Sequence, residues 1–177
     1  MLPQLQATDV GNALVNLYGK CLSISEAHNV FNSLCSHNVA SWNALIGGYS
    51  QERLGQEALY CFKRMQSEGL SPNAITFLSV LSACSHSGLL DEAQMFYGDM
   101  TNKYSITPKL GHHSCMVLAF GCAGHFDEAV SVIKAMPSSD HSVIWLTLLG
   151  ACKKWGNVKL GRLVFDQALQ LDDTCAV

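Results

Sequence analysis

Cysteine and histidine are the residues of this chain with the most versatile chemistry. The sequence has eight cysteines and seven histidines among 177 residues. Their densest group comprises His112, His113, Cys115 and Cys122. Imidazole and thiolate bind zinc, but this spacing matches no usual zinc pattern, and no Cys-x-x-Cys pair occurs in the sequence. We therefore expect no metal and no cofactor, and we interpret the cysteines as buried thiols that pack as small apolar side chains.

A second group with possible chemistry is basic: Lys153, Lys154, Lys159 and Arg162. It could contact phosphates or a protein partner, or it could be an ordinary solvated surface. The formal net charge of −3 argues mildly against a nucleic-acid partner, because phosphate binding draws on Lys and Arg. Trp42, Trp145 and Trp155 could stack on bases. Trp42 and Trp145 precede apolar helix-core residues, however, so we expect them to pack inside the protein.

The sequence offers no basis for catalysis or for membrane insertion. It has no Gly-rich phosphate loop and no Ser/His/Asp set. Its longest apolar run, near residues 116–120, is far too short to span a bilayer. Residues 1–10 resemble neither a signal peptide nor a transit peptide. Because the pattern described next begins and ends within a unit, we expect a fragment of a longer chain.

A repeated Glu-Ala pair organises the chain. It occurs at intervals of 31, 35 and 36 residues, as Glu26-Ala27, Glu57-Ala58, Glu92-Ala93 and Glu128-Ala129. Periods near 34 residues are typical of helical-hairpin repeats. A fifth unit, with Leu160-Gly161 in place of the pair, has diverged.

Apolar positions keep a fixed distance from each repeated Ala. Four and seven residues later come large apolar residues, as in Phe62 and Met65, on the same helical face as Ala58. Thirteen and twelve residues earlier come apolar pairs, as in Leu45-Ile46, which belong to an earlier helix. Turn-forming residues separate the two helices. The sequence therefore predicts an all-α solenoid of antiparallel helix hairpins.

Three stretches resemble the pentatricopeptide-repeat family of plants: GNALVNLYGKC from residue 11, VASWNALIGGYS through SGLLDEA over residues 39–93, and HHSCMVLAFGCAGHFDEAVSVIKAMP from residue 112. The resemblance is to the subclass that mixes short, standard and long repeats. It implies a right-handed superhelix that binds single-stranded RNA in mitochondria or plastids, one base per repeat. The fifth and last residues of each repeat would read the base.

The same resemblance divides the chain into units. Residues 1–7 would be a remnant of a preceding repeat. Residues 8–38 resemble a short repeat, 39–73 a standard one, 74–109 a long one and 110–141 a second short one. Residues 142–177 resemble the start of the C-terminal extension, of E type, that follows the repeats in that subclass.

Base-reading roles transfer to this chain only through the resemblance. The first two repeats would each use an Asn pair suited to a pyrimidine, C or U, and the fourth a less regular pair: Asn12 with Asn38, Asn43 with Asn73, and Ser114 with His141. The third repeat would offer Leu78 and Lys109, and the fifth Leu146, to which we assign no base. A side-chain amide suits this role because it can pair with the exposed edge of an unpaired base.

Structural roles compete with base reading at the same residues. Asn12 and Asn43 could cap the first helices of their repeats, because Asn is a favoured N-cap residue. Asn38 and Asn73 could be ordinary turn residues between repeats.

The expected function is sequence-selective binding of single-stranded RNA in organellar RNA processing or C-to-U editing. No catalysis is expected from this chain, because the His-x-Glu and Cys-x-x-Cys of a zinc deaminase are missing from the sequence. Editing would therefore require a deaminase or another editing factor supplied in trans. The alternative is a helical-repeat scaffold for protein–protein interaction, which the low basic content favours.

Overall fold

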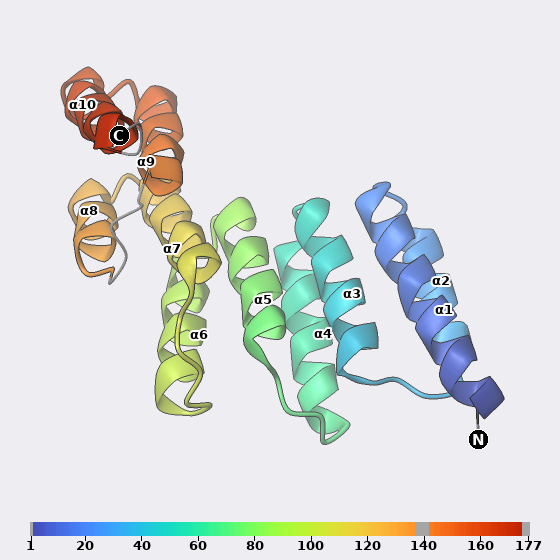
Figure 1. The fold of residues 1–177 in the computed structure, drawn as a ribbon. Coiled ribbons are helices and arrows are strands. Elements are labelled where there is room, and N and C mark those ends of the chain that lie inside the picture. The colour runs from blue at the N-terminus through green and yellow to red at the C-terminus, as the bar shows by residue number, and fades with distance from the viewer. Residues whose placement is uncertain (1, 137–141, 175–177) are drawn as a thin grey trace. The chain divides into compact units, whose positions relative to one another are not determined.

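The described part of the chain is entirely helical. The structure, a computed structural model, describes residues 2–136 and 142–174, in which there are ten helices and no strand (Figure 1). The helices are α1 (Leu2–Lys20), α2 (Ile24–Ser33), α3 (Val39–Gln51), α4 (Gly55–Ser67), α5 (Ala74–Ser87), α6 (Leu90–Asn102), α7 (Leu110–Ala123), α8 (Phe126–Lys134), α9 (Ser142–Trp155) and α10 (Val158–Thr174). The predicted all-α class is confirmed.

The helices form consecutive hairpins in two compact units. The first unit, residues 1–107, contains α1–α6, and the second, residues 108–177, contains α7–α10. In the first unit α1 packs against α3 and α3 against α5, while each even-numbered helix packs against the helix before it (Figure 1). In the second unit α7 packs against α8 and α9, and α9 packs against α10. The first helices α1, α3 and α5 therefore lie side by side.

The repeated Ala residues belong to the hydrophobic core. Ala27, Ala58, Ala93 and Ala129 are each 0% exposed. Met65 and Met100, seven residues after Ala58 and Ala93, are equally buried. The predicted apolar face of the second helices is thus part of the core. Residues 2–7, which we expected to be a remnant of a preceding repeat, continue the same helix as residues 8–20.

Asn residues start α3 and α5. The Oδ1 atom of Asn38 accepts a hydrogen bond from the backbone N–H of Ser41 at 3.0 Å, and the Ser41 hydroxyl accepts one from the N–H of Asn38 at 3.1 Å. Asn73 and Thr76 make the same reciprocal pair, at 3.0 Å in both directions. Each pair is a capping box, which satisfies two backbone donors that a helix start leaves without partners.

A left-handed residue ends the first helix of every hairpin. These residues are Leu22, Arg53, Gly88, Gly124 and Gly156, with φ between 56° and 83°. Glycine adopts this conformation without steric cost, whereas Leu22 and Arg53 carry a Cβ atom that disfavours it. The turns lie where the sequence predicts them, but at two of the five the left-handed position is occupied by Leu22 or Arg53, which disfavour a positive φ.

Candidate functional site

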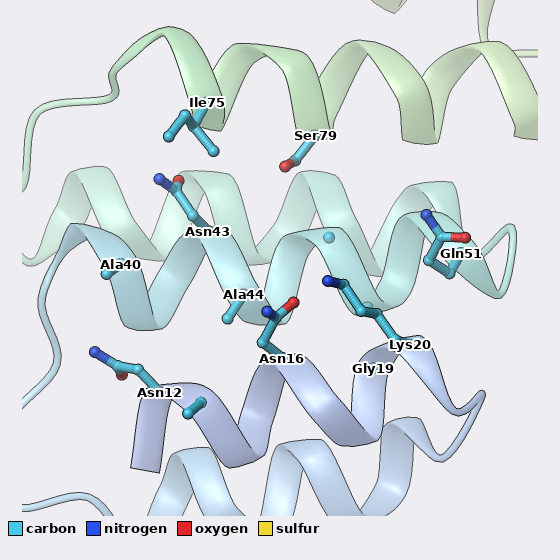
Figure 2. Close-up of a pocket in the computed structure, with 13 residues that line it drawn as sticks. Asn12, Asn16, Gly19, Lys20, Ala40, Asn43, Ala44, Gln51, Ile75 and Ser79 are labelled. Carbon is cyan, nitrogen blue, oxygen red and sulfur yellow. The ribbon is translucent and has the colours of Figure 1, made fainter. Parts of the chain in front are cut away.

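A groove runs along the three adjacent first helices of the first unit. Figure 2 shows the thirteen residues that line it, drawn from α1, α3 and α5. They are mostly small residues and side-chain amides: Asn12, Ala13, Asn16, Gly19, Lys20, Ala40, Asn43, Ala44, Gly47, Gly48, Gln51, Ile75 and Ser79. Of these described lining residues, Lys20 alone carries a charge. The groove therefore combines small apolar residues with side-chain amides that can form hydrogen bonds.

Close packing of α1 on α3 forms the floor of the groove. A Cβ atom added to Gly19 would lie 2.9 Å from the Cα atom of Gly48, and one added to Gly48 would lie 3.1 Å from the Cα atom of Gly19. Real Cβ atoms need more room, so any larger residue at either position would push the two helices apart. The two glycines thus hold α1 close against α3, and Asn12, Asn16 and Asn43 line the same groove (Figure 2).

Asn43 and Asn73 form a connected amide pair beside the groove. The Nδ2 atom of Asn43 donates to Oδ1 of Asn73 at 3.3 Å, and Oδ1 of Asn43 accepts from the Thr76 hydroxyl at 2.6 Å. The Oδ1 atom of Asn73 also accepts from the backbone N–H groups of Ile75 and Thr76, both at 3.0 Å. Both amide oxygens are therefore engaged within the protein, and the amide nitrogens keep donors to offer.

Asn12 and Asn38 repeat this pair one hairpin earlier. The Nδ2 atom of Asn12 donates to Oδ1 of Asn38 at 3.4 Å, and Asn38 caps α3. This pair lacks the bond that the Thr76 hydroxyl makes with Asn43. The Ser41 hydroxyl is directed at Oδ1 of Asn38, at 3.2 Å, and not at Asn12. Oδ1 of Asn12 is buried and has no hydrogen-bond partner in the described structure.

The alternative interpretation of Asn12 and Asn43 as helix N-caps is wrong. Both lie inside helices, Asn12 within α1 and Asn43 at the fifth residue of α3, so neither is an N-cap. The caps are Asn38 and Asn73, which we considered as ordinary turn residues. The sequence carried a signal for this arrangement, since a hydroxyl residue follows each of these two Asn residues at the third position, as in a capping box.

The other predicted base-reading positions are not among the residues that line this groove. Ser114 is a partly buried residue of α7, in the second unit. His141 falls outside the described residues. Leu78 on α5 and Leu146 on α9, to which the sequence analysis assigned no base, are exposed apolar side chains. Lys109 precedes α7, and its backbone N–H donates to Nδ1 of His112 at 3.0 Å.

The predicted basic cluster lies on the last hairpin. Lys153 and Lys154 are in the last turn of α9, Lys159 and Arg162 are in α10, and all four are exposed. Lys153 and Arg162 border a second groove, which has a largely apolar lining that includes Leu146, Leu149, Val158 and Phe165. The cluster is therefore the edge of an apolar surface as well as a group of cations.

Comparison with known proteins places the repeats in one family. The family described as the PPR repeat family matches residues 37–86, and the PPR repeat itself matches residues 12–39, 75–104 and 112–141. The chain belongs to the pentatricopeptide repeat family. This confirms the family to which the sequence was assigned by resemblance.

Its curated relatives are longer plant proteins. The chain is 42% identical over 165 residues to pentatricopeptide repeat-containing protein At4g16470 of Arabidopsis thaliana, covering 93% of this chain and 33% of the relative. It is 41% identical over 163 residues to At3g53360, named mitochondrial, and 40% identical over 166 residues to At1g08070, named chloroplastic. These two alignments cover 92% and 94% of this chain and 21% and 22% of the respective relatives. This pentatricopeptide repeat chain thus spans between a fifth and a third of the relatives' length.

Solved structures of the same family share its fold. The crystal structure of the pentatricopeptide repeat protein PPR10 in complex with an 18-nt psaJ RNA element matches with a TM-score of 0.79 and 20% identity, over 91% of this chain and 25% of that one. The crystal structure of PPR10 from maize matches with a TM-score of 0.70 and 22% identity, over 93% and 24%. The predicted helical-repeat fold is confirmed.

Two of the three tryptophans of the pentatricopeptide repeat chain belong to its core. Trp42 is 0% exposed and Trp145 is 8% exposed, which confirms the packing role expected for them. Trp155 is 54% exposed, and its Nε1–H donates to the carbonyl oxygen of Cys122 at 3.3 Å. Trp155 thereby satisfies a carbonyl near the end of α7, a role that the sequence analysis did not predict.

The described cysteines differ in exposure. Cys61, Cys84 and Cys152 are buried, as expected, and Cys115 and Cys122 are partly buried, but Cys21 and Cys35 are exposed, which corrects the prediction for those two. No disulfide is present among the described cysteines, and Cys175 lies outside them. Burial raises the pKa of Cys61 to about 12 and that of Cys115 to about 11, so both remain thiols at neutral pH.

Two further features bear on cofactors and membranes. The described residues contain no group of three His, Cys, Asp or Glu side chains placed to hold a metal ion, and this includes His112, His113, Cys115 and Cys122. His112 is buried, and its Nδ1 atom already accepts a hydrogen bond from Lys109. No helix in the described ranges is long and apolar enough to cross a bilayer.

Proposed function

We propose that this chain binds single-stranded RNA in the groove formed by α1, α3 and α5. Each Asn pair, Asn12 with Asn38 and Asn43 with Asn73, would read one pyrimidine. The observation that carries the proposal is that both pairs are hydrogen-bonded amides, presented at equivalent places on neighbouring hairpins. A related protein of the same fold, PPR10, was solved in complex with an RNA element.

The chemistry of the second pair favours a base that offers acceptors. Asn43 and Asn73 use their oxygens within the protein, which leaves Nδ2–H groups for a ligand. Cytosine and uracil both carry the O2 acceptor, so a donor-rich pair can bind either of them. Ala40 and Ile75 line the groove close to Asn43 and would contact the faces of the base (Figure 2).

Two other predicted groups take lesser parts in the proposal. Ser114, with His141, would contribute a third and weaker reading position in the second unit. Lys153, Lys154, Lys159 and Arg162 would contact RNA phosphates or a protein partner. Their exposure at neighbouring helix ends supports a contact role without deciding between the two.

The biological setting is proposed from the relatives. Some are named mitochondrial or chloroplastic, which supports the proposal that this chain acts in one of these organelles, in RNA processing or C-to-U editing. In the second case the deaminase or another editing factor would act in trans, and this chain would supply recognition alone.

A titration by fluorescence anisotropy tests the binding. The purified chain and its Asn43→Ala variant would be titrated with pyrimidine-rich, purine-rich and random single-stranded RNA at two salt concentrations. We expect the wild type to prefer pyrimidine-rich RNA, and Asn43→Ala to weaken that binding roughly fivefold, the size of one or two hydrogen bonds. Asn29→Ala, on the exposed side of α2, is the matched control. Equal binding of all three RNAs by the wild type would refute base reading.

The apolar groove of the last hairpin favours the second candidate, a protein scaffold. Leu146 is 55% exposed and Phe165 is 49% exposed, and the cations Lys153 and Arg162 border the groove. Such a surface fits a partner with an apolar ridge flanked by acidic residues. The scaffold would be supported if Leu146→Glu abolished capture of a protein by the immobilised chain after nuclease treatment. If capture disappeared on nuclease treatment alone, RNA binding would explain it.

A further inference from the structure

We propose that Thr76 is a positioning residue that fixes the amide of Asn43 for base reading. The inference rests on the proposed function, and it adds a residue outside the two Asn positions of the repeat. Thr76 belongs to the next hairpin, in the first turn of α5, and is fully buried. It would therefore act through Asn43 without touching the base.

Thr76 is placed to orient Asn43 through a single hydroxyl. Its Oγ1 atom lies 2.6 Å from Oδ1 of Asn43 and 3.1 Å from Oδ1 of Asn73, while it accepts from the backbone N–H of Asn73 at 3.0 Å. A hydroxyl has one proton to donate, and the shorter contact identifies Asn43 as its acceptor. Since an amide can rotate by half a turn, a fixed donor at its oxygen decides which end faces the ligand.

The preceding hairpin lacks this bond although it has the same Asn pair. Ser41 is the residue equivalent to Thr76, and its hydroxyl is directed at Oδ1 of Asn38, at 3.2 Å. Oδ1 of Asn12 is left buried with no partner in the described structure. An unsatisfied buried oxygen costs free energy, so the amide of Asn12 is held less firmly than that of Asn43. The two pairs are alike in sequence, but only one of them is locked.

The locked amide should discriminate better than the unlocked one. With its oxygen occupied by Thr76, Asn43 presents Nδ2–H and rejects a base that offers a donor at that point. The amide of Asn12 is held only by the 3.4 Å bond from its Nδ2 to Asn38, with no donor at its oxygen, so its preference among bases is weaker. The orientation of the Asn43 amide thus depends on Thr76, whereas the Asn12 amide receives no hydrogen bond from Ser41.

Thr76→Val and Ser41→Ala form a matched pair of variants. Each removes one buried hydroxyl and the reciprocal bond of one capping box, so both weaken a helix start by a similar amount. Only Thr76→Val removes a donor from the amide at the fifth residue of a repeat, because the Ser41 hydroxyl is directed at Asn38 and not at Asn12. Each variant would be titrated with adenine-rich RNA that carries one or two pyrimidines, and the amide exchange of Asn43 and Asn12 would be followed by NMR without RNA.

The two measurements separate this inference from the proposed function. In protein without RNA, we expect Thr76→Val to speed solvent exchange of the Asn43 Nδ2 protons by roughly three- to tenfold, the loss of about one hydrogen bond, and Ser41→Ala to leave those of Asn12 nearly unchanged. With RNA, Thr76→Val should reduce the pyrimidine preference by a similar factor, and by more than Ser41→Ala does. If the exchange of Asn43 is the same in Thr76→Val as in the wild type, or if both variants lose base preference equally, the positioning role is wrong. If the wild type has no base preference, the proposed function is wrong. The amide exchange of Asn43, measured without RNA, still tests whether Thr76 fixes that amide.

Discussion

The side-chain oxygen of Asn73 has two kinds of partner. It accepts hydrogen bonds from two backbone N–H groups at the start of α5 and from Nδ2 of Asn43, which lines the groove. One residue thus fixes the first turn of the next hairpin and also borders the proposed base. Binding data on a variant of Asn73 must therefore separate loss of recognition from loss of the helix cap.

Two substitutions of Asn73 separate these effects. We expect Asn73→Ala to lower the free energy of unfolding by about 1 kcal/mol, because Ala cannot cap a helix. Asn73→Asp should keep nearly all of that stability, because a carboxylate is an equally good cap. Urea unfolding followed by circular dichroism measures both. Equal stability of the Ala variant and the wild type would contradict the capping role.

Buried thiols give the chain a pH dependence with a definite sign. Burial raises the pKa of Cys115 to about 11 from an ordinary value of 9.0, so the folded state keeps a proton that the unfolded state releases between these values. The free energy of unfolding should therefore fall as the pH rises from 9 to 11, and this contribution is fully present below pH 9. At pH 8, alkylation read by mass spectrometry should modify the exposed Cys21 and Cys35 well before Cys61 and Cys115. Equal alkylation rates would show that the helix packing is looser than described.

At the scale of the helix, the five hairpin turns share one conformation but not one residue type. Gly88, Gly124 and Gly156 fill three of them, and Leu22 and Arg53 fill the other two. Residue type predicted that turns occur there, because glycine marks most of them. It did not predict that Leu22 and Arg53 are left-handed, because the packing of the two flanking helices imposes that conformation on them.

Arg53→Gly should stabilise the second hairpin. Relief of a left-handed side-chain residue is worth about 1 kcal/mol, less the entropy that glycine adds to the unfolded chain. The reverse change Gly88→Ala, at the equivalent turn, should destabilise by about 1 kcal/mol. Thermal unfolding of the two variants should shift in opposite directions. A shift in the same direction would mean that the backbone angles of these turns do not govern their stability.

Across the whole chain, the sequence predicted the repeat better than it predicted the site. Burial of Ala27, Ala58, Ala93 and Ala129 follows from helical periodicity alone, because spacings of four and seven residues define one face. The roles of the Asn residues do not follow from their type, because an amide serves equally as a cap and as a reader of bases. Hydrogen-bond geometry separates the capping amides from those inside helices.

Apolar side chains remain exposed on both units. Val10 and Leu17 on α1 are 62% and 54% exposed, and Val158 and Leu163 on α10 are 65% and 63% exposed. We expect the isolated chain to self-associate at high concentration and Val10→Glu with Leu17→Glu to reduce this, as measured by sedimentation velocity. Asn29→Glu with Asn32→Glu adds the same charge to α2 without removing apolar surface. If this control disperses the chain equally well, net charge is responsible and the α1 surface is not.

We propose that neighbouring hairpins read neighbouring bases through their Asn pairs. The most direct measurement compares the affinity of the chain for two adenine-rich RNAs of equal length and composition. One carries two adjacent pyrimidines, and the other carries two pyrimidines separated by a purine. Because Asn12 and Asn43 occupy equivalent places on adjacent hairpins, we expect the first RNA to bind more tightly, by roughly the fivefold that one reading position contributes. Equal affinity for the two RNAs would contradict one-base-per-repeat reading by these residues.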